Sequence, residues 1–107
     1  MAELLNVSEA DFEEQVLKKD KLVIVDFGAT WCAPCKKLHP LLEELLEEYG
    51  GEVEGAYVDV GANQNLARQY GVISVPQTHF FKGGEHLDQV IGLGKKDKYK
   101  NLIEVHK

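Results

Sequence analysis

The sequence has few basic residues, and this shortage excludes some classes of partner. Only 12 lysines and arginines stand against 18 aspartates and glutamates, which gives a net charge of -6 at pH 7. Nucleic acids and anionic membranes select basic surfaces, so we expect neither as a partner. No stretch approaches the roughly 18 apolar residues of a membrane-spanning helix. The first residues also lack the basic start and apolar core of a signal peptide, which predicts a cytoplasmic protein.

Cysteine is equally scarce, because Cys32 and Cys35 are the only two in 107 residues. A structural disulfide stabilises a fold mainly by restricting the unfolded chain, and a longer loop gains more than one this short. The Cys-x-x-Cys pair is therefore better suited to electron exchange than to stapling a fold. In the cytosol such a pair is usually catalytic, redox-sensing or metal-binding.

A metal site is the weaker interpretation of these cysteines. Together with His39 they offer three ligands, whereas a structural zinc site uses four. There is no second Cys-x-x-Cys, and the remaining histidines are scattered as His79, His86 and His106. We expect no metal and no bound cofactor, and we interpret each histidine as a solvated or hydrogen-bonded side chain.

The hydrophobic pattern predicts one α/β domain over residues 1–107. The expected helices cover residues 8–19, 34–49, 63–70 and 95–105, with Ser8 and Asn63 as N-caps. The expected strands cover residues 4–7, 22–27, 53–60, 78–81 and 87–91, the last two joined as a hairpin by Gly83-Gly84. Strands that alternate with helices, followed by a hairpin, predict a central mixed sheet of about five strands flanked by about four helices.

The cysteines lie between a strand that should be buried and the start of a helix. Unpaired N–H groups at a helix N-terminus stabilise a thiolate. We expect Cys32 to be exposed and to act as the attacking nucleophile. Cys35, one turn further, should be shielded and act as the resolving thiol. Asp26 lies in the apolar run before them, so its carboxyl should be desolvated and its pKa raised.

Several motifs resemble the thioredoxin family from one end of the chain to the other. The matching elements, in order, are Asp26-Phe27, Trp31-Cys32-Ala33-Pro34-Cys35-Lys36, Tyr70-Gly71-Val72, Val75-Pro76, Phe81-Lys82-Gly83-Gly84 and Gly92. The resemblance implies the thioredoxin fold and reduction of protein disulfides by dithiol–disulfide exchange. It also implies that Asp26 exchanges a proton with Cys35, and that a thioredoxin reductase and disulfide-containing proteins are the partners of a monomer.

The same resemblance implies a target-binding surface. Pro76 resembles the family's cis-proline opposite the disulfide, and Val75 would offer backbone hydrogen bonds to an extended substrate. Trp31, Ile73 and Gly92 would supply a flat apolar rim. Ala33 and Pro34, between the cysteines, would tune the redox potential.

Four positions depart from the family pattern. Ala33 replaces the usual glycine, which would stiffen the start of the helix. Tyr57 stands where a lysine often accompanies the buried acid. Gly28 replaces an aromatic residue, and Gln77 replaces the threonine after the proline. None of these changes removes a catalytic group, but together they leave the partner preference open. The alternatives are a donor dedicated to one partner, or an oxidase or isomerase. A scaffold in which the thiols are idle is disfavoured by the intact cysteine pair with Asp26 and Pro76.

Overall fold

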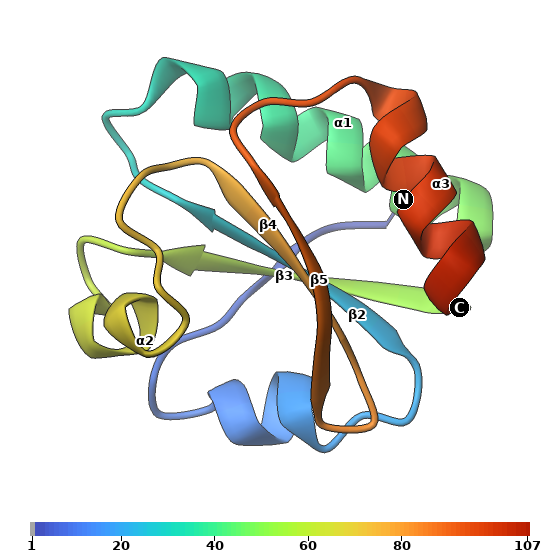
Figure 1. Ribbon diagram of the computed structural model, residues 1–107, viewed down its shortest axis with the longest axis horizontal. Helices are drawn as coiled ribbons and strands as arrows, with labels where there is room; N and C mark the ends of the chain where they lie inside the picture. The colour runs from blue at the N-terminus through green and yellow to red at the C-terminus, as the bar shows by residue number, and fades with distance from the viewer. Residues whose placement is uncertain (1) are drawn as a thin grey trace.

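The computed structural model describes residues 2–107, which form a five-stranded mixed sheet with the strand order β1-β3-β2-β4-β5 (Figure 1). Strands β1, β3 and β2 are parallel, whereas β4 runs antiparallel to β2 and β5 antiparallel to β4. The strands are β1 (Leu5–Asn6), β2 (Leu22–Gly28), β3 (Val53–Asp59), β4 (Gln77–Lys82) and β5 (Glu85–Ile91). The sheet predicted from the sequence is confirmed.

Helices cover both faces of this sheet (Figure 1). The long helix α1 (Ala33–Tyr49) and the C-terminal helix α3 (Lys96–His106) lie on one face, and α2 (Gln64–Gln69) and the π-helical segment η1 (Glu13–Leu17) lie on the other. All seven residues of β2 are buried, because the strand has neighbours on both sides and helices above and below. Side chains alternate along a strand. Ile24 therefore packs in the core beneath α1 and α3, while Val25 packs in the opposite core.

Helix α1 positions the cysteines at its first turn. Its apolar face buries Leu38, Leu42 and Leu45, which recur at helical spacing. Pro34 occupies the first turn, where no backbone N–H is missed. Gly50 ends the helix in the left-handed region, at a φ of 56°.

Two local predictions are wrong. The first helix is only a π-helical turn, in which the N–H of Lys18 donates to the carbonyl of Glu13. Ser8 is not its N-cap, because the turn begins only at Glu13 with Phe12 as N-cap, although the Ser8 N–H and hydroxyl both donate to Asp11 Oδ1. Asn63 does precede α2, but its side chain accepts from the Glu9 N–H and donates to the carbonyl of Asp59, so it ties α2 to neighbouring segments.

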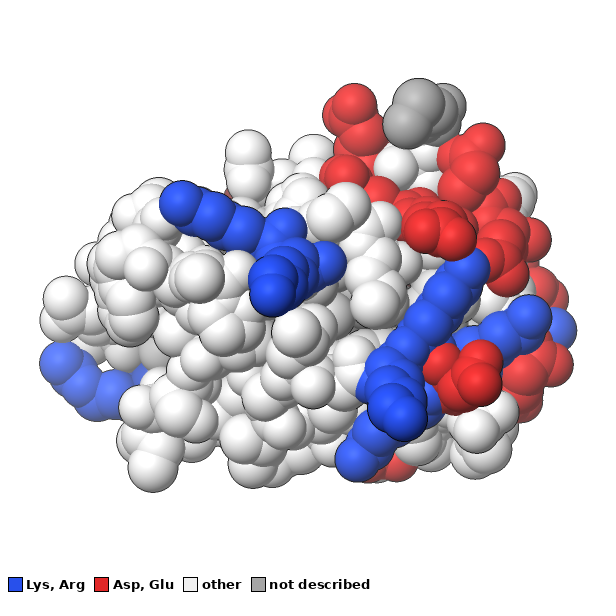
Figure 2. All heavy atoms as spheres, turned by 90° about the horizontal axis from the view of Figure 1, so that it is seen from above, with Lys and Arg blue, Asp and Glu red and all other residues white. Residues whose placement is uncertain are grey.

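The surface charge is unevenly distributed. Figure 2 shows acidic side chains gathered at one end of the molecule, whereas the opposite end is mostly uncharged with scattered basic side chains. The acidic face of α1 includes Glu43, Glu44, Glu47 and Glu48. Among residues 2–107, none of the helices has the length and apolar character needed to cross a membrane.

Candidate active site

Cys32 and Cys35 form a disulfide at the start of α1, with their Cα atoms 5.3 Å apart. Cys32 is the N-cap and has an extended backbone conformation. The backbone N–H of Cys35 donates to Cys32 Sγ at 3.2 Å. This sulfur therefore occupies the position in which a helix N-terminus stabilises negative charge.

The expected difference in exposure between the two cysteines is not found. Cys32 is 5% exposed and Cys35 is 4% exposed, because the closed pair packs against Ala29, Val60 and Val75. The prediction that Cys32 is the exposed member is wrong for this disulfide form. What distinguishes the two sulfurs is their place on the helix: Cys32 caps it, whereas Cys35 lies inside the first turn.

Asp26 lies in the middle of β2 and is completely buried, on the face covered by α1. Burial raises the pKa of its carboxyl to about 7. Neither carboxyl oxygen has a hydrogen-bond partner among the described residues. Its cross-strand neighbours are Tyr57 on β3 and Thr78 on β4, and the Thr78 hydroxyl is likewise buried and unpaired. Near neutral pH this carboxyl can both accept and release a proton.

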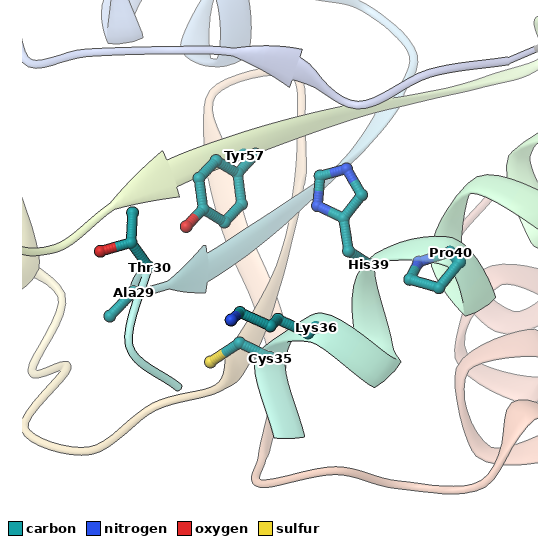
Figure 3. A pocket seen from close by; sticks show the side chains of 7 residues that line it. All are labelled: Ala29, Thr30, Cys35, Lys36, His39, Pro40 and Tyr57. Atoms are coloured by element: carbon teal, nitrogen blue, oxygen red, sulfur yellow. The ribbon is translucent and has the colours of Figure 1, made fainter. Parts of the chain in front are cut away.

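His39 completes this part of the site, although the sequence interpretation had weighed it only as a metal ligand or an ordinary solvated side chain. Its Nδ1 lies 3.7 Å from Asp26 Oδ2, and its Nε2 lies 3.4 Å from Glu43 Oε2. The imidazole lines a pocket of about 300 Å³ beside Cys35 and faces the ring of Tyr57, as Figure 3 shows. Cys35, His39 and Glu43 are spaced four residues apart, so they share one face of α1. That spacing is the signal that could have identified His39.

Apolar side chains surround the disulfide on the outside. Trp31 is 75% exposed and Ile73 is 97% exposed, although large apolar side chains usually pack inside. The Val75–Pro76 peptide bond is cis, as the resemblance implies, and the carbonyl of Pro76 accepts from the Gly92 N–H at 2.8 Å. The sequence interpretation missed Ile91 and Leu93, which are also exposed and flank Gly92.

Comparison with known proteins identifies this arrangement. The family model described as Thioredoxin matches residues 3–105. The chain belongs to the thioredoxin family. It is 39% identical to the thioredoxin of Synechocystis sp. over 98 residues, which cover 92% of each chain. It is 37% identical to the thioredoxin of Staphylococcus aureus over 103 residues, covering 96% of this chain and 97% of that one. A solved structure of a mutant thioredoxin from Halobacterium salinarum superposes with a TM-score of 0.88 at 38% identity, covering 97% of this chain and 90% of that chain.

As a thioredoxin-family member, the protein is a thiol–disulfide oxidoreductase that reduces protein disulfides, and its Cys32–Cys35 pair is at disulfide distance. Family membership implies a thioredoxin reductase and disulfide-containing proteins as partners. Within residues 2–107, no group of three or more histidine, cysteine, aspartate or glutamate side chains is placed to hold a metal ion.

Two departures from the thioredoxin pattern, Gly28 and Tyr57, prove to be linked. A Cβ added at Gly28 would lie 3.0 Å from Tyr57 Cε1 and 3.5 Å from Cys35 Cβ. The glycine therefore makes room for the tyrosine ring beside the cysteines. Burial, and then the charges of Asp59 and Asp26, raise the pKa of Tyr57, so the phenol stays neutral and supplies no charge to balance Asp26.

A third departure, Gln77, joins a hydrogen-bond chain on the opposite face of the sheet. The buried His79 contacts Gln77 Oε1 through Nε2 at 3.0 Å and His86 Nε2 through Nδ1 at 2.8 Å. Since an amide oxygen only accepts, the Nε2–H of neutral His79 donates to Gln77 and its Nδ1 accepts from His86. Burial, and next the charge of His86, lower the pKa of His79 to about 4. His79 is therefore a neutral, fully bonded side chain.

Proposed function

We propose that Cys32 is the nucleophile and Cys35 the resolving thiol of protein-disulfide reduction. The Cys32 thiolate attacks a target disulfide, forms a mixed disulfide and expels one target sulfur as a thiolate. Cys35 then attacks Cys32 Sγ, which releases the second target sulfur and closes the Cys32–Cys35 disulfide. Two electrons pass to the target, and a reductase restores the dithiol. The hydrogen bond from the Cys35 N–H to Cys32 Sγ at the helix start carries this assignment.

Asp26 takes the proton that Cys35 must lose before it attacks. A thiol is a poor nucleophile until it is ionised, so a base near neutral pH assists the resolving step. The buried Asp26 carboxyl, with its pKa of about 7, matches that requirement. In the reverse direction, when the disulfide is reduced again, Asp26 returns the proton.

The apolar rim binds the target in this proposal. An extended target segment lies against Trp31 and Ile73, with Gly92 on the far side. It hydrogen-bonds to the backbone of Val75, whose side chain packs against the Cys32–Cys35 pair. Ala33 and Pro34, between the cysteines, set the redox potential. We further propose that residues 1–107 act as a single domain and a monomer in the cytoplasm, where thiols are kept reduced.

A trapping experiment tests the division between the two cysteines. The Cys35→Ser variant should attack insulin and stall as a mixed disulfide through Cys32, visible on a non-reducing gel and lost on adding dithiothreitol. The matched Cys32→Ser variant should form no such adduct. If the adduct instead forms on Cys35 in Cys32→Ser, the assignment is reversed. If neither single variant forms an adduct and the intact protein does not reduce insulin, the fold serves as a scaffold.

A further inference from the structure

We propose that His39 relays the proton between Asp26 and solvent during the resolving step. The inference rests on the proposed role of Asp26 in taking the proton from Cys35. His39 acts through Asp26 and does not touch the reacting sulfur atoms.

The need for a relay follows from the burial of Asp26. At pH 6.5 a carboxyl with a pKa of about 7 mostly carries a proton, so it must release that proton before it can take the one from Cys35. Asp26 is 0% exposed, and none of the described residues hydrogen-bonds either of its oxygens. Direct exchange with bulk water is therefore blocked, and the proton needs a neighbouring group that reaches the surface.

His39 is the one basic side chain within 4.0 Å of Asp26 in the part of the chain that the structure describes. It leaves 35% of its side-chain surface exposed, so the same ring touches both the buried carboxyl and solvent. Its two nitrogens point to different carboxylates, Asp26 at 3.7 Å and Glu43 at 3.4 Å. The pocket that it lines beside Cys35, of about 300 Å³, is large enough to hold water against the imidazole ring (Figure 3).

The charges around the imidazole favour this path. Asp26 faces it from β2 and Glu43 faces it from α1, so a proton on the ring has a carboxylate on either side. Glu43 is itself oriented, because its Oε2 accepts from the Leu4 N–H at 3.0 Å. Apart from Cys35, the other titratable side chains that line this pocket are Lys36 from α1 and Tyr57, whose ring faces the imidazole from β3.

In this proposal the proton moves from Cys35 to Asp26, then to His39, and finally to solvent. Cys35 gives its proton to the Asp26 carboxylate and attacks Cys32 Sγ. Asp26 then passes the proton to His39 Nδ1, directly or through one water, which leaves Asp26 ionised and His39 as an imidazolium. The imidazolium releases its Nε2 proton to water or through Glu43. No electrons move in these steps, and the reverse order delivers a proton to Cys35 when the disulfide is reduced.

The test separates attack from resolution with Ellman's reagent. In a stopped-flow reaction of the reduced protein, attack by Cys32 releases one thionitrobenzoate and resolution by Cys35 releases the second. For His39→Gln we expect the first release to be unchanged. The second should slow about tenfold at pH 6.5, below the roughly hundredfold that a direct general base contributes. The difference should fade toward pH 9, where solvent base becomes plentiful. His106→Gln is the matched control, because His106 also pairs with a carboxylate, Asp88, but far along the chain at the end of α3.

Two further measurements exclude a merely structural effect. Free imidazole should restore the second release in His39→Gln, since a proton carrier can enter the emptied pocket, and it should leave the intact protein unchanged. In the Asp26→Asn background, His39→Gln should have no additional effect. The relay is wrong if His39→Gln slows both thionitrobenzoate releases equally, if it still slows the second release in the Asp26→Asn background, or if free imidazole does not restore that release. None of these outcomes would contradict the role of Asp26. If Asp26→Asn leaves the second release unchanged, the proposed function of Asp26 fails and the relay with it.

Discussion

Asp26 and His79 are two buried titratable side chains on adjacent strands, yet their surroundings are opposite. In the register of β2 and β4, Asp26 lies beside Thr78 and Val25 lies beside His79, so the two groups are one residue apart on opposite faces of the sheet. Both are 0% exposed. Both nitrogens of His79 are hydrogen-bonded, whereas neither oxygen of Asp26 has a partner among the described residues.

The comparison shows that two equally buried groups can differ in whether their polar atoms are hydrogen-bonded. Burial pushes each group toward its neutral form: it raises the pKa of Asp26 to about 7 and lowers that of His79 to about 4. Most buried polar atoms in proteins are hydrogen-bonded, and an unpaired one calls for an explanation. The unpaired group here is the one on the cysteine side, where an open lone pair can receive a proton. His79 has no free position to offer.

The largest expected effect is that of Asp26→Asn. Turnover in insulin reduction should fall about 10- to 100-fold, because the resolving thiol loses its base. The free energy of unfolding at pH 8 should rise by about 3 kcal/mol, because ionisation of a group with a raised folded-state pKa opposes folding as pH rises. Asp20→Asn, at an exposed aspartate, is the control for both measurements and should change neither. An Asp26→Asn protein that is less stable and equally active would show that Asp26 is neither destabilised by burial nor the base for Cys35.

His79→Ala should lower stability and leave turnover nearly unchanged, the opposite of Asp26→Asn. It leaves a cavity and an unpaired Gln77 amide, so we expect a loss of about 2–4 kcal/mol in the free energy of unfolding by urea. Turnover per folded molecule should stay within about twofold of the intact protein, since His79 is on the face away from the cysteines. A loss of turnover as large as that of Asp26→Asn would erase the distinction between the two groups.

Asp26 and His79 should also give the stability of the protein opposite dependences on pH. Between about pH 4 and 6.5 the folded chain retains a proton on Asp26 that the unfolded chain loses, so this group makes stability fall as pH rises. Over the same range the unfolded chain holds a proton on His79 that the folded chain lacks, so stability rises with pH. The two slopes, each about 1.4 kcal/mol per pH unit, nearly cancel.

A variant that lacks one of these groups should therefore show the pH dependence of stability that the other group causes. As the pH rises from 4.5 to 6.5, the free energy of unfolding of Asp26→Asn should increase relative to that of the intact protein by about 2–3 kcal/mol. His79→Gln should lose a similar amount over the same range. Urea unfolding at three pH values measures both differences. Curves that run parallel to that of the intact protein would mean that neither pKa is shifted by folding.

The smallest expected effect concerns Thr78, whose buried hydroxyl is unpaired like the carboxyl beside it. Thr78→Val replaces the hydroxyl with a methyl group and removes an unsatisfied polar atom. We expect a gain of about 0.5–1 kcal/mol at pH 5, where Asp26 is neutral. A clear loss of stability would mean that the hydroxyl has a hydrogen-bond partner in solution.

The sequence predicted Asp26 but not His39, and the reason is geometric. Asp26 interrupts a β-branched run, so its burial follows from the strand alone. The proximity of His39 depends on how α1 is rotated over β2 and β3, which the pattern of one helix does not determine. The bonded pair of His79 and His86 likewise depends on the register of a hairpin. The exposure of Cys32 was mispredicted because closing the disulfide draws both sulfurs against Ala29 and Val75.

The missing side chain at Gly28 constrains which residues this site accepts. A Cβ at position 28 would lie 3.0 Å from Tyr57 Cε1, so the tyrosine ring must shift to admit any side chain there. A slender lysine at position 57 would remove the obstruction and at the same time bring a permanent cation toward Asp26. Positions 28 and 57 are therefore coupled: the tyrosine ring fills the space that a side chain at position 28 would need.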